Sequence, residues 1–157
     1  MRGEVIDVIK WIKNIYWRKV LLTGFLYTVI AFVLHQLEVI ITMKYYLMPE
    51  YFGLWSKLMM PKAGPPPLEF FITSLVFTFV TGVSLALVYY YVRDLLPKDF
   101  KKRVFYFADL MIATSFIFFT LPTYLLFNVP GGLLIIWFMT SFIILLAGSF
   151  VFVKLIK

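Results

Sequence analysis

Residues 20–43 read VLLTGFLYTVIAFVLHQLEVIITM, and this stretch decides the fold class. An α-helix rises about 1.5 Å per residue and the hydrocarbon core of a bilayer is about 30 Å thick, so a spanning helix needs roughly 20 mostly apolar residues. The stretch meets that length. It therefore predicts a helix that crosses a membrane.

Small and polar residues recur along this stretch at intervals of three or four positions, which places them on one face of a helix. Lipid tails cannot satisfy polar groups, so we expect this face to point toward other helices or a wet cavity. The residues on it are Gly24, Thr28, Ala31, His35, Glu38 and Thr42.

The composition of the whole chain agrees with a membrane protein. It has 157 residues, of which 62% are hydrophobic and 20% aromatic, and its mean hydropathy is +0.93. These values exceed those of soluble domains and predict a single integral membrane domain that contacts the lipid bilayer. The net charge of +7 comes from basic residues beside apolar stretches, so we expect no nucleic acid partner.

The sequence predicts an all-α integral membrane protein, an antiparallel up-down bundle of four transmembrane helices. A basic amphipathic helix in the interface plane is expected over 1–19, before the first span. An aromatic and proline-rich connection follows that span, with a short helix starting near Pro49, and Pro122 is expected to kink or end the third span. The four spans are expected over 20–43, 68–92, 104–127 and 133–153, with outer and basic connections over 44–67 and 93–103.

Lysine and arginine are distributed unevenly around the expected spans. Twelve of them lie before the first span, in 93–103 and after the last span, whereas three lie in 44–67 and none in 128–132. Basic residues are enriched on the cytoplasmic side of membrane proteins. We therefore expect both termini in the cytoplasm, in a prokaryotic cytoplasmic membrane.

Four ionisable side chains within or beside the spans are the candidates for function: His35, Glu38, Glu69 and Asp109. His35 and Glu38 share a helix face, and Glu69 begins the second span near their expected depth, so the three could form an outward-facing polar pocket. The alternative is that His35 and Glu38 only pin two helices together. Asp109 could extend a proton or ion path inward, or pair with Arg103, Lys19 or neighbouring hydroxyls.

No metal and no cofactor are expected. One histidine and no cysteine leave only carboxylates to complete a metal shell. The lack of cysteine also excludes disulfides, thiolate nucleophiles and iron–sulfur ligation. Phosphate-binding loops and nucleophile elbows are absent from the sequence.

Small residues in three of the spans predict close helix packing. They are Gly24 and Ala31 in the first span, Gly82 and Ala86 in the second, and Gly148 in the fourth.

Three functions fit these features. The first is a non-catalytic accessory or assembly subunit that packs against itself or a larger membrane complex. The second is an oligomeric small transporter, channel or lipid-binding protein that uses the polar stripe. The third is a lipid-modifying enzyme with His35 and Glu38 as acid and base.

Overall fold

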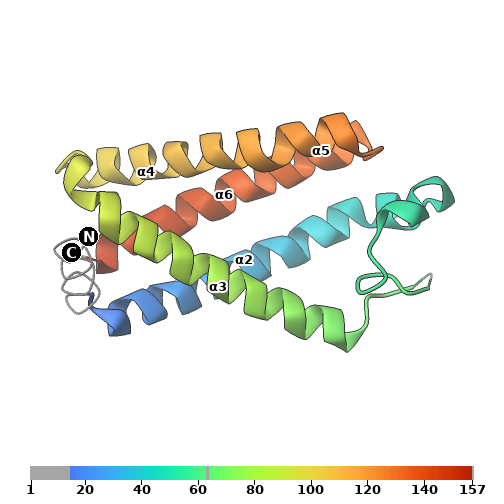
Figure 1. Ribbon diagram of the computed structural model, residues 1–157, viewed down its shortest axis with the longest axis horizontal. Coiled ribbons are helices and arrows are strands. Elements are labelled where there is room, and N and C mark those ends of the chain that lie inside the picture. The colour runs from blue at the N-terminus through green and yellow to red at the C-terminus, as the bar shows by residue number, and fades with distance from the viewer. Residues whose placement is uncertain (1–14, 63, 157) are drawn as a thin grey trace, which may run out of the picture.

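The computed structural model describes residues 15–62 and 64–156, and helices dominate them (Figure 1). Two short 3₁₀ helices, η1 and η2, precede and follow α3, and a π-helical turn, η3, joins α4 to α5. The bounds are α2 Trp17–Tyr46, η1 Pro49–Leu54, α3 Leu68–Val92, η2 Arg93–Leu95, α4 Phe100–Ser115, η3 Phe116–Thr120, α5 Leu121–Leu126 and α6 Gly131–Leu155.

Four helical segments in the described ranges are long and apolar enough to cross a membrane. They contain 30, 28, 27 and 25 residues, and each exceeds the roughly 20 residues that a bilayer core requires. No strand occurs among these residues. The prediction of an all-helical chain with four long apolar helices is confirmed.

The first helix is longer than predicted. Helix α2 begins at Trp17 and ends at Tyr46, so Trp17–Lys19, which we assigned to an interfacial helix, form its first turn. Of the rest of that predicted interfacial helix, Ile15 and Tyr16 are not helical, and residues 1–14 lie outside the described residues. The third span also begins earlier, at Phe100, because the Asp99 carboxylate caps it by accepting a 2.9 Å hydrogen bond from the backbone N–H of Lys102.

Pro122 does not end the third span, which continues to Leu126. A proline lacks the N–H that would bond to the carbonyl four residues earlier, and its ring collides with that carbonyl. The helix relieves this collision with the wider π-helical turn η3, in which the N–H of Leu121 bonds to the carbonyl of Phe116, five residues back.

Helices α2 and α6 lie at the centre of the molecule, with α3 packed mainly on α2 and α4 mainly on α6. Neighbouring helices run antiparallel (Figure 1). Helices α3 and α4 are consecutive in the chain, yet they diverge from the turn that joins them. The up-down bundle that we expected would keep these two helices side by side along their length.

A chain of four aromatic rings joins all four helices near the termini. Tyr27 of α2 stacks on Phe152 of α6 at 6.0 Å between ring centroids, and Phe152 contacts Phe107 of α4 at 6.2 Å. Phe107 in turn contacts Tyr89 of α3 at 5.2 Å. The last three rings are fully buried. Ring pairs of this kind add about 0.5–1.5 kcal/mol each beyond simple burial, so the core is concentrated at this end.

Glycine residues allow the central helices to come close together. A Cβ atom on Gly82 of α3 would lie 2.8 Å from both the carbonyl oxygen of Gly24 and Cδ1 of Tyr27. A Cβ atom on Gly148 of α6 would lie 2.7 Å from Cδ2 of Tyr27. The Tyr27 ring is therefore held between two helix surfaces that have no side chain at the contact.

We predict that Gly82→Ala destabilises the protein, since the new methyl group must push α3 away from backbone atoms of α2. Overpacking of this kind costs about 1–3 kcal/mol. Thermal unfolding followed by the fluorescence of the four tryptophans should shift to lower temperature. The matched control is Gly131→Ala, because a Cβ atom there meets nothing within 4 Å. Equal unfolding temperatures for the two variants would contradict the close approach of α2 and α3.

Candidate functional site

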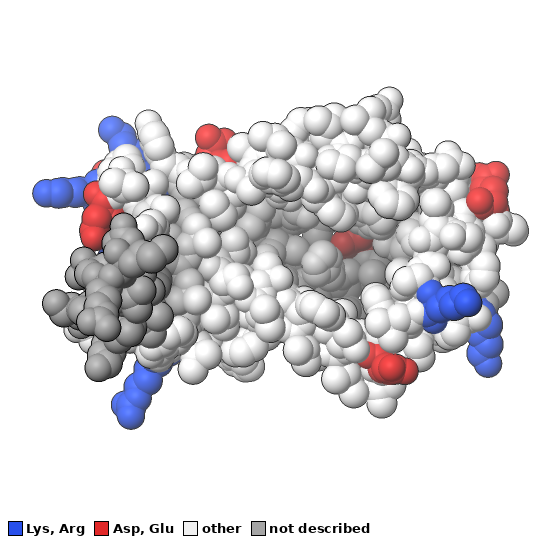
Figure 2. Space-filling view, in the orientation of Figure 1, with Lys and Arg blue, Asp and Glu red and all other residues white. Residues whose placement is uncertain are grey.

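A hollow opens between the α2–α3 side and the α4–α6 side of the molecule, beyond the aromatic core. Figure 2 shows this hollow with an acidic side chain at its floor. Glu38, on the outer half of α2, is buried, with 5% of its side chain exposed. Its burial places a carboxyl group between helices in an otherwise apolar region.

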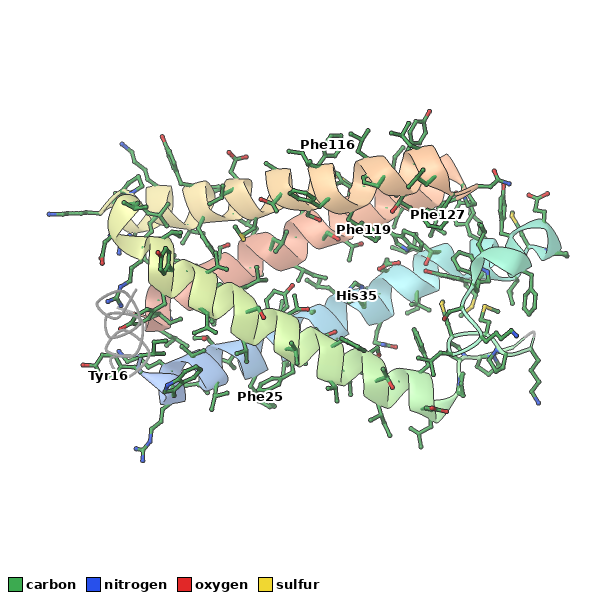
Figure 3. All side chains as sticks on the ribbon, in the orientation of Figure 1. Tyr16, Phe25, His35, Phe116, Phe119 and Phe127 are labelled. Atoms are coloured by element: carbon green, nitrogen blue, oxygen red, sulfur yellow. The ribbon has the colours of Figure 1, made fainter. Side chains whose placement is uncertain are left out.

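Glu38 is paired with His35, one turn earlier on α2, and Figure 3 shows where His35 lies on this helix. The distance between His35 Nδ1 and Glu38 Oε2 is 2.9 Å, and 49% of the His35 side chain is exposed. An ionised carboxylate can only accept hydrogen bonds, so Nδ1 is then the donor and Nε2 is left for other contacts. The pair therefore presents one free imidazole nitrogen.

The Glu38 carboxylate depends on this hydrogen bond. A buried carboxylate is costly unless it is paired or hydrogen-bonded. Nearby, the Thr42 hydroxyl donates to the backbone carbonyl of Glu38 at 2.8 Å and not to the carboxylate. Among the described residues, His35 is the hydrogen-bond partner of the carboxylate.

An aromatic cluster joins the outer connection to α2 and α6. The Trp137 indole N–H of α6 donates to the hydroxyl oxygen of Tyr46 at 3.2 Å. The ring of Trp55, directly after η1, lies 4.8 Å from Tyr46 and 6.4 Å from Trp137 between centroids. Sequence reasoning predicted only a headgroup-level helix in this connection. The signal for the cluster was the concentration of aromatic residues there.

The other predicted residues do not join the pair. Glu69 lies exposed in the first turn of α3, and within the described ranges no hydrogen bond or ion pair links it to His35 or Glu38. Asp109 lies exposed on α4, in a groove between α4 and α6. The described part of the chain contains no group of three or more His, Asp or Glu side chains that could hold a metal ion. The expected three-residue pocket is therefore reduced to one pair.

The five small residues that we predicted for helix packing are all buried. Gly82 and Gly148 lie against Tyr27, Gly24 lies against Val83 of α3, and Ala31 and Ala86 belong to the buried cluster of the same helices.

Comparison with protein-family models, curated proteins and solved structures gave no match.

We predict that the His35–Glu38 pair is energetically coupled. In a double-mutant cycle with His35→Ala and Glu38→Gln, the free energy of unfolding in mixed micelles should show a coupling of about 1–2 kcal/mol, because removing the imidazole leaves a buried carboxylate unpaired. Gln36→Ala is the control, since Gln36 is an exposed neighbour on α2, and its effect should stay within about 0.5 kcal/mol. Strictly additive effects of the two single substitutions would refute the coupling.

Proposed function

We propose that this chain spans a membrane four times, with both termini in the cytoplasm, as a non-catalytic interaction subunit of a larger membrane complex. Membrane insertion is supported by the four long apolar helices and by the distribution of charge. Figure 2 shows the basic side chains at the two ends of the molecule and an almost uncharged surface between them. This distribution matches a bilayer core between two headgroup layers.

The main support for the subunit function is His35, whose side chain is half exposed beside the hollow. Its partner Glu38 is buried, but 49% of the His35 side chain is exposed. A polar group exposed to lipid is costly. A protein segment that covers the hollow and bonds to the free imidazole nitrogen would remove that cost.

A catalytic function has less support in this geometry. General acid–base chemistry needs groups that position a substrate as well as those that transfer protons. Within residues 15–62 and 64–156, two predicted groups converge, His35 and Glu38.

A second candidate function is lipid binding, alone or within an oligomeric transporter. The same free imidazole nitrogen could donate or accept a hydrogen bond with a lipid headgroup that enters the hollow from the side. A conducting path through one protomer has less support, because Asp109 lies on the outer surface of α4 and not in the hollow.

Native mass spectrometry of the protein, extracted gently from its own membrane, distinguishes these functions. We expect to find a second protein in stoichiometric amount. It should dissociate more readily from the His35→Ala variant of this chain than from the Gln36→Ala variant. The other result is a monomer or homo-oligomer that retains a defined lipid and loses this lipid in the His35→Ala variant. That result would support the lipid-binding function and overturn the subunit proposal.

The proposed topology can be tested by cysteine labelling, since the chain has no cysteine of its own. A membrane-impermeant maleimide added to intact cells should label Lys62→Cys, in the outer connection, and should leave Lys101→Cys unlabelled until the membrane is opened. The opposite pattern of labelling would invert the orientation.

A further inference from the structure

Asp109 is a carboxylate on the outer surface of α4. It lies six residues after Arg103, so it is about 9 Å further along the helix than the basic residues at the start of α4. Its side chain is exposed and borders a groove of about 360 Å³ between α4 and α6. The other residues that line the groove are Phe105, Tyr106, Ala108, Ile112, Phe142 and Leu146.

Asp109 has no hydrogen bond or ion pair within the described part of the chain. Two of the pairings considered from the sequence, with Arg103 and with Lys19, are not formed. The Arg103 Nε–H donates to the carbonyl of Pro97 at 2.8 Å, and Lys19 Nζ lies over the Tyr16 ring at 5.4 Å from the centroid. At the depth expected for Asp109, an unpaired carboxylate that faces lipid is unfavourable. The groove is therefore incomplete in the isolated chain.

We propose that this groove binds a transmembrane helix of another protein, one that carries a lysine or arginine at the level of Asp109. The proposal rests on the interaction-subunit function above and names the chemistry of the partner. The partner's basic group would neutralise Asp109, and its apolar face would cover the aromatic walls of the groove.

The shape of the groove fits a helix. On α4, the lining residues Phe105, Asp109 and Ile112 are four and three positions apart, so they form one ridge along the helix axis. On α6, Phe142 and Leu146 are four positions apart and form the facing ridge. Two parallel ridges with a furrow between them are the surface into which a third helix packs.

Charge argues against a second copy of this chain as the occupant. Two copies that docked groove to groove about an axis along the membrane normal would bring their two Asp109 carboxylates together at the same depth, where they would repel each other. The lysine of α6, Lys154, does not supply the basic group that a second copy would need at this level. It lies eight residues beyond Leu146, or about 12 Å along the axis, and its Nζ lies over the Phe150 ring, 5.6 Å from the centroid.

Site-specific photo-cross-linking of the full chain in its own membrane tests the proposal. A benzophenone amino acid replaces Phe142 in the groove, and a control variant carries it at Phe77, an exposed residue of α3. Each is combined with Asp109→Asn, which removes the charge and keeps the shape, or with Leu110→Ala, an exposed neighbour that does not line the groove. Unfolding temperatures establish that both variants are folded.

The expected product joins position 142 to a transmembrane helix of another protein, within one turn of a lysine or arginine. Asp109→Asn should reduce its yield about tenfold, as expected for loss of a desolvated charge pair, whereas Leu110→Ala should not. Asp109→Lys should abolish the product, and changing the partner's basic residue to Asp in that background should restore it.

Three outcomes would overturn the proposal: cross-links to lipid alone, cross-links to a second copy, or a partner whose yield is unchanged in Asp109→Asn. A stoichiometric partner in native mass spectrometry together with any of these results would leave the subunit function intact and reject only the groove. The absence of any partner in both experiments would reject both.

Discussion

The packing of Tyr27 between two glycines is the constraint on which the rest of the structure depends. Its ring lies against Gly82 of α3 and Gly148 of α6 and stacks on Phe152, so one side chain of α2 contacts both neighbouring helices. Helix α2 accordingly has seven buried residues, whereas α3 has three. The backbones of α2 and α3 come close together here, and the two helices cross and then separate toward the outer end of the molecule (Figure 1).

This crossing explains why a polar pair can exist in an apolar protein. Near the termini, the rings of Tyr89 and Phe107 join α3 to α4 and close the core. Further out, α3 has diverged and leaves a hollow with an acidic side chain at its floor (Figure 2), and on this half of α2 Glu38 is buried and His35 is half exposed. The hydrogen bond between them lowers the cost of the buried carboxylate, but it uses only one of the two imidazole nitrogens. The hollow and the groove at Asp109 are two separate places where a polar group is exposed, and the proposed subunit function assigns a partner to them.

Much of the fold could be predicted from the sequence because it depends on local properties. Apolar length determined the four long helices, and the i, i+3 spacing placed His35 beside Glu38 within one turn. The order of the helices could not be predicted, since it depends on which glycine meets which side chain across the molecule, and Tyr27 resembled any other aromatic residue of an apolar span. For the same reason the sequence did not indicate that Asp109 faces outward or that Glu69 stays apart from the pair. The π-helical turn before Pro122 was missed because it is one of several ways in which a helix can accommodate proline.

The most direct test of this account measures how far apart the helices lie at the two ends of the molecule. Pairs of nitroxide labels on introduced cysteines, measured by double electron–electron resonance in lipid nanodiscs, would compare an inner pair with an outer pair. The inner pair is Val88 of α3 with Phe105 of α4, and the outer pair is Ile72 of α3 with Leu125 of α5; all four residues are exposed. We predict a clearly longer distance for the outer pair than for the inner pair. Equal distances for the two pairs would mean that α3 and the third span run side by side, and that the hollow around Glu38 does not exist.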